Sequence, residues 1–239
     1  DIVLKRPPFN VIQMPQRDQL RAAFETLDAD DRVRIIVLRA EGEHFSSGGD
    51  IKGFLDATPE SVSKLAWNIA APTRCTKPVI AANHGYCFGV GFEISLACDF
   101  RIAAESTLYA LPEQKLGQIP GSGGSARLQK MVGITRTKDI VMRSRRIKGQ
   151  QAYEWGVATE CVPDSELASA VSKLVDELRA FSPLAQRTAK KMLNETEDCL
   201  LTTAIEVEGH CYSRLRNSDD FKEGVEAFHG KRQPNFVGY

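Results

Sequence analysis

The stretch PVIAANHGYCFGVGFEISLACDFRIAA, residues 78–104, indicates the architecture of the chain. It opens with the apolar run 78–83, which is typical of a strand covered on both faces. A glycine-rich turn then leads into a short helix around residues 91–98, and a second strand follows over residues 99–104. A strand, a glycine loop, a helix and a strand in this order predict a crossover unit of an α/β layered fold.

The patterns outside this stretch extend it into a large α/β body followed by helices. We predict an α/β body over residues 1–180 and a C-terminal helical region over residues 181–239. The apolar faces of the C-terminal helices pack either on another subunit or on the chain's own body, and the sequence leaves both open. The further predicted elements are helices at 14–28, 58–71, 120–133, 149–155, 164–181, 184–194, 199–215 and 218–230, and strands at 33–40, 107–110 and 157–162.

Composition excludes several classes of protein. Lysine plus arginine and aspartate plus glutamate both number 31, so no net charge attracts nucleic acid or an anionic membrane. The six cysteines form no CxxC pair and no zinc-type spacing, which predicts a reducing, cytoplasmic compartment and no metal site. No apolar run approaches the roughly 18–20 residues of a membrane span.

Glu93 is the one carboxylate in the apolar helix around residues 91–98. It shares a helical face with Leu96 and Ala97, so it is expected to be buried, and an unpaired buried carboxylate is costly. Two interpretations remain open at this point. Glu93 is either a core residue satisfied by a backbone amide or an arginine, or a group that exchanges protons with a substrate.

Glu113 follows 20 residues later, after the strand that succeeds the Glu93 helix, in a turn stiffened by Pro112. Taken alone it has the character of a surface loop acid. Two acids near the ends of neighbouring elements can however face one cavity, where two carboxyl groups take up protons at different pH and supply one acid and one base.

Two small-residue turns suggest a way to bind an oxygen atom. FSSGGDIKGF, residues 45–54, follows the strand at 33–40, and GVG, residues 89–91, opens the Glu93 helix. Small residues allow close approach of the backbone to a ligand, and N–H groups at a helix start point outward. The two turns together can direct two N–H groups at one oxygen, which is the arrangement of an oxyanion hole.

These motifs resemble those of the crotonase family, the enoyl-CoA hydratases and isomerases. The resemblance covers nearly the whole chain, since five segments follow in the family's order. They are RPPFNVI, FSSGGDIKGF, KPVIAANHGYCFGVGFEISLACDFRIAAEST, LPEQKLGQIPGSGGSARL and DFKEGVEAFHGKRQPNF. The resemblance implies a spiral of ββα units with C-terminal helices that build trimers, often paired into hexamers.

The resemblance also implies roles for individual residues. The backbone N–H groups of Gly49 and Val90 would hold the thioester oxygen of a coenzyme A ester, Glu93 would bind and deprotonate water, and Glu113 would protonate the α-carbon. Both acids together favour hydration of a 2-enoyl-CoA, with the coenzyme A thioester as substrate and with no metal or permanently bound cofactor. The predicted substrate-binding residues are Ser47, Asp50, Ile51, Lys52, Phe54, Gly89, Phe92, Leu116 and Gly121.

Val90 departs from the family pattern, which usually has glycine at this position. A β-branched residue resists positive φ, so Val90 is predicted to have a negative φ at the start of its helix. The alternative activities are a Δ3,Δ2-enoyl-CoA isomerase, for which Glu113 alone suffices, and hydration of dienoyl or cyclic thioesters.

Two alternative hypotheses assign the chain to other functional classes. An RNA-binding or inert family member would use RSRRIK, residues 143–148, but no aromatic platform interleaves these charges. A serine hydrolase would use Ser122, but Pro120 occupies the first glycine position of the GxSxG motif.

Overall fold

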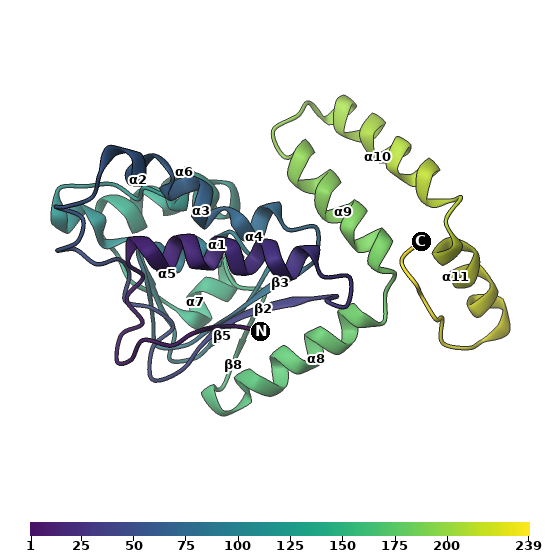
Figure 1. The fold of residues 1–239 in the computed structure, drawn as a ribbon, viewed down its shortest axis with the longest axis horizontal. Coiled ribbons are helices and arrows are strands. Elements are labelled where there is room, and N and C mark those ends of the chain that lie inside the picture. Colours follow the sequence, from purple (N-terminus) through teal and green to yellow (C-terminus); the bar gives the residue numbers. More distant parts are fainter.

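The computed structural model describes residues 1–239 and has an α/β architecture built on a parallel sheet (Figure 1). Five strands lie in the order β1-β2-β3-β5-β8, and every neighbouring pair is parallel. The α/β class predicted from the crossover unit is therefore confirmed. The strands are β1 Ile2–Leu4, β2 Ile36–Ala40, β3 Val79–Asn83, β5 Phe100–Ala104 and β8 Glu160–Val162.

A second, smaller sheet lies beside the first and carries the turns of interest. Its three strands lie in the order β4-β6-β7, with β4 parallel to β6 and β7 antiparallel to it. The strands are β4 Tyr86–Phe88, β6 Leu108–Ala110 and β7 Ile147–Lys148. β4 lies where the sequence predicts a glycine-rich turn, because three residues between glycines are too few for a strand pattern to be seen.

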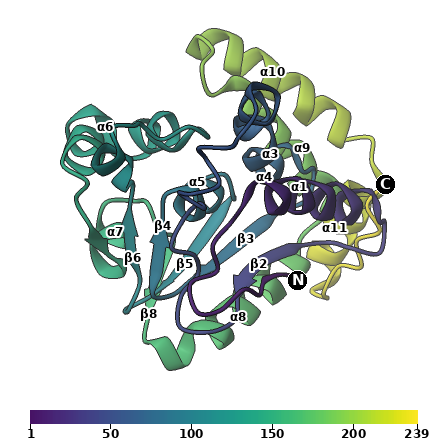
Figure 2. The same cartoon turned by 60° about the vertical axis from the view of Figure 1, so that its left-hand side comes forward.

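Helices cover both faces of the main sheet, as the turned view shows (Figure 2). Alternate side chains of β2 point to opposite sides: Ile36 and Leu38 join the larger core, and Val37 joins a smaller one with Leu174 and Leu178 of α8. Since the strands are covered on both faces, they show apolar runs and not an alternating pattern. The helices of the body are α1 Met14–Ala29, α2 Pro59–Ser63, α3 Leu65–Ile69, α4 Ala71–Arg74, α5 Val90–Leu96, α6 Gly124–Met142, α7 Gly149–Glu154 and α8 Leu167–Arg179, with 3₁₀ turns η1 Pro112–Leu116 and η2 Asp164–Glu166.

Two predicted helices differ from the structure. The single helix expected from Thr58 to about Ala71 is three short helices, α2 to α4. The helix expected over residues 120–133 begins at Gly124 and continues to Met142 across a kink at Gly133, whose φ of 76° and ψ of 167° are not helical. Glycine tolerates this positive φ without a side-chain clash, so the chain changes direction there.

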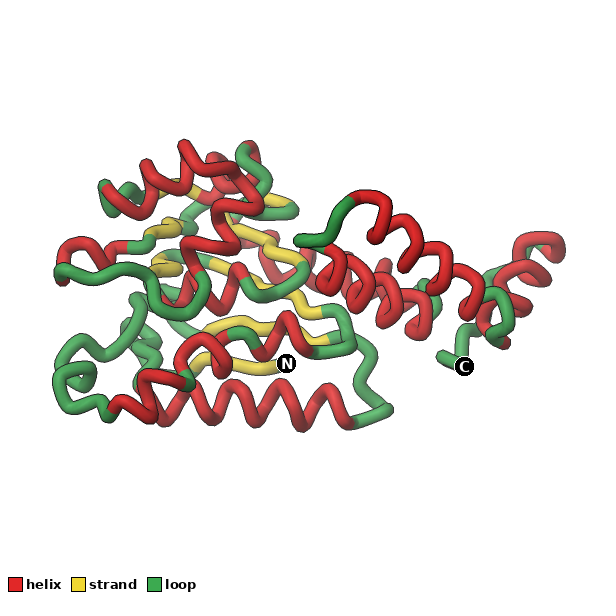
Figure 3. Tube along the Cα trace, turned by 90° about the horizontal axis from the view of Figure 1, so that it is seen from above, coloured by secondary structure: helices red, strands yellow, loops and turns green.

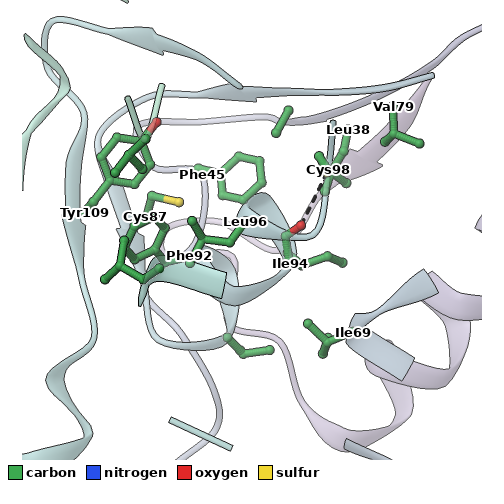
Figure 4. Close-up of a cluster of buried hydrophobic side chains, with 14 of the residues drawn as sticks. Leu38, Phe45, Ile69, Val79, Cys87, Phe92, Ile94, Leu96, Cys98 and Tyr109 are labelled. Atoms are coloured by element: carbon green, nitrogen blue, oxygen red, sulfur yellow. Dashed lines mark hydrogen bonds between the residues drawn. The ribbon is translucent and has the colours of Figure 1, made fainter. Parts of the chain in front are cut away.

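The larger core surrounds α5, every residue of which is buried. Figure 4 shows Phe92 and Leu96 of α5 among Phe45, Cys87 and Tyr109, which belong to the neighbouring loop and strands. The short helix that carries Glu93 is thus enclosed on all sides, which is more than the single apolar face the sequence indicated.

The C-terminal helices extend away from the sheets, as the view from above shows (Figure 3). They are α9 Pro183–Thr196, α10 Leu201–Leu215 and α11 Asp219–Gly230. Lys190 of α9 ties this region to the body, because its Nζ lies 2.7 Å from Asp99 Oδ2 and 2.9 Å from the carbonyl oxygen of Pro72. No residue of α10 is buried, and its large apolar side chains Leu201, Ile205 and Tyr212 are exposed in the single chain.

Candidate active site

The carboxylate of Glu93 is buried and held by two backbone amides. The residue is 3% exposed, and its Oε1 accepts hydrogen bonds from the N–H groups of Ser122 at 2.7 Å and Gly124 at 3.1 Å. Its Oε2 makes no hydrogen bond within the chain and is not fully enclosed. One carboxylate oxygen is therefore fixed in place, and the other remains free to bind a ligand or water.

The glycine turn at the start of α6 makes this arrangement possible. The first N–H groups of a helix have no partner within the helix, so they are free to bind the carboxylate. A Cβ on Gly124 would lie 2.9 Å from Glu93 Cγ, so only glycine fits at this position. The sequence indicated a glycine turn that opens a helix but not that it holds Glu93, although unpaired N–H groups at such a turn are the signal that could have shown it.

Glu113 lies in η1, which follows β6 after the single residue Leu111, and is half-buried. Its Oε2 is enclosed and has no hydrogen-bond partner. Burial, and to a smaller extent the negative charge of Glu93, raise the pKa of Glu113 to about 7. Glu113 is therefore close to half-protonated at neutral pH, which suits a group that gives and takes a proton.

The side chain of Glu113 reaches the glycine turn before α5. A Cβ on Gly89 would lie 3.0 Å from Glu113 Oε1, and Gly89 itself has a φ of 49°. Glycine is needed at this position for two reasons: the positive φ and the close approach of the Glu113 carboxyl group. Gly89 immediately precedes the helix of Glu93, so the carboxyl group of Glu113 lies near the start of that helix, and the charge of Glu93 acts on its pKa.

The two small-residue turns lie side by side. The N–H of Phe88 donates to the carbonyl of Ser46 at 2.9 Å, and a Cβ on Gly48 would lie 3.9 Å from the Cα of Gly89. Neither Gly49 N–H nor Val90 N–H donates a hydrogen bond within the chain. Val90 is the first residue of α5 and its φ is not positive, which confirms the prediction for this residue.

The other predicted binding residues have different positions. Asp50 is tied to the start of α1, since its Oδ2 accepts from Gln13 Nε2 at 2.8 Å, and Ser47 N–H donates to the carbonyl of Phe9 at 2.8 Å. The exposed members of the predicted set, which are open to a ligand, are Ile51, Lys52, Phe54, Leu116 and Gly121.

Phe92 requires a correction. It was predicted to contact the substrate, but it is completely buried, and its ring centroid lies 4.8 Å from that of Tyr109 (Figure 4). The reason is that α5 is enclosed on all sides, so the side chain beside Glu93 in sequence points into the core. We therefore assign Phe92 to packing and not to the surface of the site.

Two arginines near Glu93 are not among the residues predicted for the site. Arg17 of α1 is 3% exposed, and its Nη1 lies 3.5 Å from Ser122 Oγ. Arg127 of α6 donates from Nη1 to the carbonyl of Ser122 at 3.0 Å. Burial lowers the pKa of both arginines, and the charge of Glu93 acts in the opposite direction on both. Arg17 stands three residues before Leu20 and seven before Phe24 on the buried face of α1, and that spacing could have revealed it.

The basic run RSRRIK is engaged within the chain. Arg143 and Arg145 both form ion pairs with Asp139, and the guanidinium of Arg146 lies 5.1 Å from the ring centroid of Phe88. No group of three or more His, Cys, Asp or Glu side chains is arranged to hold a metal ion. None of the helices is long and apolar enough to cross a membrane.

Comparison with known proteins defines the class. The family model described as "Enoyl-CoA hydratase/isomerase" matches residues 1–238, which is almost the whole chain. The chain therefore belongs to the enoyl-CoA hydratase/isomerase, or crotonase, family.

Individual relatives agree with this assignment. The chain is 32% identical to a probable mitochondrial enoyl-CoA hydratase 2 of Arabidopsis thaliana, covering 100% of this chain and 81% of that protein. It is 34% identical to a carnitinyl-CoA dehydratase of Salmonella enteritidis, covering 100% and 94%. The fold matches the crystal structure of an enoyl-CoA hydratase from Bacillus anthracis with a TM-score of 0.93, at 32% identity and over 99% and 96% of the two chains.

Proposed function

We propose that the chain is an enoyl-CoA hydratase-type lyase that adds water across the 2,3 double bond of an enoyl-CoA thioester. The observation that carries this proposal is the pairing of Glu93, held by two backbone amides, with Glu113, whose pKa is raised to about 7. Two carboxyl groups in one site, one of them protonated near neutral pH, supply the base and the acid that water addition needs.

The two turns supply electrostatic stabilisation. The N–H groups of Gly49 and Val90 have no acceptor within the chain, and in this proposal both donate to the thioester oxygen. Negative charge collects on that oxygen as the enolate develops, so the two donors act most strongly in the transition state. The reaction then needs no metal and no resident cofactor, and coenzyme A enters only as part of the substrate.

The proton transfers balance within the pair of acids. Water bound at Glu93 attacks C3 of the enoyl group and loses a proton to the Glu93 carboxylate, while Glu113 gives its proton to C2. The pair holds one proton before and after the reaction. That proton is on Glu113 before water addition and on Glu93 after it. The return of the proton from Glu93 to Glu113 through the next water molecule restores the starting state.

The names of the relatives support the same chemistry in two directions. One relative is named as a hydratase and another as a dehydratase, and water addition and water removal share one transition state. Since neither relative exceeds 34% identity, the acyl group is not carried over from either name.

The experiment that tests the proposal is a panel of 2-enoyl-, 3-enoyl- and dienoyl-CoA esters, followed by enoyl absorbance and by identification of the products. The hydratase proposal expects loss of the absorbance of the 2-enoyl ester and formation of the 3-hydroxyacyl-CoA. Consumption of the 3-enoyl ester alone, with the 2-enoyl ester as product, would replace hydration by isomerisation through Glu113.

We also propose that the helices of residues 181–239 assemble the chain into trimers or into hexamers made of two trimers. Several large apolar side chains of α10 and α11 are exposed in the single chain, which a subunit interface would cover. These side chains are Leu201, Ile205, Tyr212, Phe221, Val225 and Phe228.

A further inference from the structure

The guanidinium group of Arg17 is buried at the site with most of its hydrogen-bond donors unused. Arg17 is 3% exposed, its Nε has no partner, and its one side-chain hydrogen bond, from Nη1 to Ser122 Oγ, is 3.5 Å long. A guanidinium carries five N–H donors, so four of them lack a partner within the chain. An enclosed charge of this kind is costly unless an anion or polar oxygen binds it.

The carboxylate of Glu93 is not the anion that binds the Arg17 guanidinium. Glu93 acts on Arg17 at a distance, but its Oε1 binds the N–H groups of Ser122 and Gly124, and the two side chains form no ion pair. Other buried cations of the chain make more and shorter hydrogen bonds than Arg17 does. Arg101, for example, donates to three backbone carbonyl oxygens, and the Nζ of Lys190 binds two carbonyls and Asp99. Arg17 is thus the exception among them.

The position of Arg17 relates it to the acyl part of the site. A Cβ on Gly49 would lie 3.2 Å from Arg17 Nη2 and 2.8 Å from Phe54 Cζ, so the guanidinium and the ring both lie against this turn. The Phe54 ring, whose centroid is 5.4 Å from the guanidinium carbon, is 39% exposed. Since Gly49 is the proposed donor to the thioester oxygen, the unused donors of Arg17 lie next to where an acyl group would begin.

From this geometry we infer that Arg17 is a specificity-determining residue that binds a carboxylate on the acyl group, so that the preferred substrate is the enoyl-CoA monothioester of a dicarboxylic acid. A carboxylate matches the planar fork of a guanidinium with two parallel hydrogen bonds. Arg17 is well placed for this, because α1 is anchored in the core by Leu20 and Phe24. The inference rests on the proposed function, since it assigns the acyl group for that reaction.

Binding of saturated thioesters tests the inference without any turnover. Glutaryl-CoA and pentanoyl-CoA have acyl chains of equal length, and only the first ends in a carboxylate. We expect wild-type protein to bind glutaryl-CoA about 10- to 100-fold more tightly in a calorimetric titration, as a charge-assisted hydrogen bond at a buried site provides. Equal affinities of the wild type for the two thioesters would overturn the inference.

Variants of Arg17 test whether this residue causes the preference for glutaryl-CoA over pentanoyl-CoA. In Arg17→Met the ratio of the two affinities is expected to fall to about 1, whereas Arg17→Lys keeps a reduced preference because a point charge lacks the fork. Arg21→Met is the matched control, since Arg21 is one turn further along α1 and pairs with Glu25. An unchanged ratio in a folded Arg17→Met protein would show that water, and not substrate, satisfies the guanidinium. If Arg17→Met does not fold, the inference is tested by the affinity ratio of the wild type and by whether Arg17→Lys lowers that ratio.

Hydration rates separate this inference from the proposed function. Wild-type protein is expected to hydrate glutaconyl-CoA with a kcat/KM about 10-fold or more above that for crotonyl-CoA. Hydration of both esters at equal rates would leave the hydratase proposal intact and remove the role of Arg17. A clear binding preference for glutaryl-CoA without hydration of either enoyl ester would support Arg17 as a carboxylate site and refute the hydratase proposal.

Discussion

Glu93 Oε1 accepts the backbone N–H of Ser122 at 2.7 Å, so the general base of the proposed reaction is oriented by the turn that opens α6. Glutamine preserves this bond, because its amide oxygen also accepts from an N–H group. The variant Glu93→Gln is therefore expected to fold normally but to lose the carboxylate that takes the proton of water. Hydration of a 2-enoyl-CoA should fall by on the order of 10²-fold or more, measured by enoyl absorbance.

The control for this variant is Glu166→Gln, which makes the same chemical change on an exposed 3₁₀ turn. It should leave the rate unchanged. Retention of hydration in Glu93→Gln, with circular dichroism equal to that of wild type, would contradict the role assigned to Glu93. Loss of hydration with retained isomerisation of a 3-enoyl ester would point to Glu113 acting alone.

The pH dependence of the rate should follow Glu113. Burial raises its pKa to about 7, so the carboxyl group holds its proton below that pH and loses it above. Water addition needs Glu113 protonated, and kcat/KM is therefore expected to decrease about tenfold per pH unit above roughly pH 7. The reverse dehydration should show the same decrease of kcat/KM above about pH 7. The reason is that the overall reaction releases no proton, and the pair of acids must hold one proton in both directions.

Profiles of kcat/KM for a 2-enoyl-CoA and for its 3-hydroxyacyl product, measured between pH 5.5 and 9.5, test this. A flat profile up to pH 9 in both directions would contradict the assignment of Glu113 as the proton donor. In Glu113→Gln the residual kcat/KM should no longer decrease above about pH 7. A decrease that persists in this variant would come from another group, such as a substrate-binding residue.

Gly89 is predicted to tolerate no side chain. Alanine there would be strained by the φ of 49° and would place its Cβ 3.0 Å from Glu113 Oε1. We expect Gly89→Ala to lose about 1–2 kcal/mol of folding stability and on the order of 10²-fold in hydration. Gly156→Ala is the matched control, since Gly156 has a φ of 77° but nothing within 4 Å of an added Cβ.

Thermal unfolding and hydration rates of the two glycine variants are compared. Similar losses of stability with a rate defect only in Gly89→Ala would support the role of the close contact. Equal rate defects in both would attribute the effect to general destabilisation and remove Gly89 from the site.

Much of this fold was accessible from the sequence because its signals are local. The buried strands are short apolar runs, and the turns that matter have glycine where the backbone has positive φ, as at Gly89. Glu93 stood out because a carboxylate in an apolar helix is costly unless something binds it. The two alternatives for Glu93 were not exclusive: backbone amides bind one of its oxygens, and the other is free.

The remaining features depend on contacts between distant segments. The partner of Glu93 is Ser122, 29 residues away, and that of Ser122 Oγ is Arg17, 105 residues away. A local pattern shows that such a group needs a partner, but not which distant residue supplies it. Phe92 was misassigned for the same reason, because its direction depends on Tyr109 and on how α5 lies in the core. The register of strands far apart in sequence decides which side chains meet.

The exposed apolar side chains of the C-terminal helices predict self-association. The chain has a mass of 26.4 kDa, and light scattering is expected to give three or six times that mass. Phe228, which is 81% exposed on α11, should be covered in the assembly, so Phe228→Lys should shift the mass toward that of a single chain. Glu226→Lys introduces the same charged group at an exposed position of α11 and should leave the mass unchanged. A wild-type mass of one chain would contradict the proposed trimer.

The N–H of Val90 can be removed without breaking its helix, which isolates the proposed oxyanion donor. Val90 is the first residue of α5, where proline is tolerated because this N–H has no helical partner. We expect Val90→Pro to fold and to lose about 10²- to 10³-fold in kcat, as loss of one oxyanion donor does elsewhere. Val90→Ala keeps the N–H, so it should lose about 2 kcal/mol of stability from the core but little rate. Equal rates in the two folded variants would show that the side chain and not the N–H of Val90 matters, and the second donor to the thioester oxygen would have to be sought elsewhere.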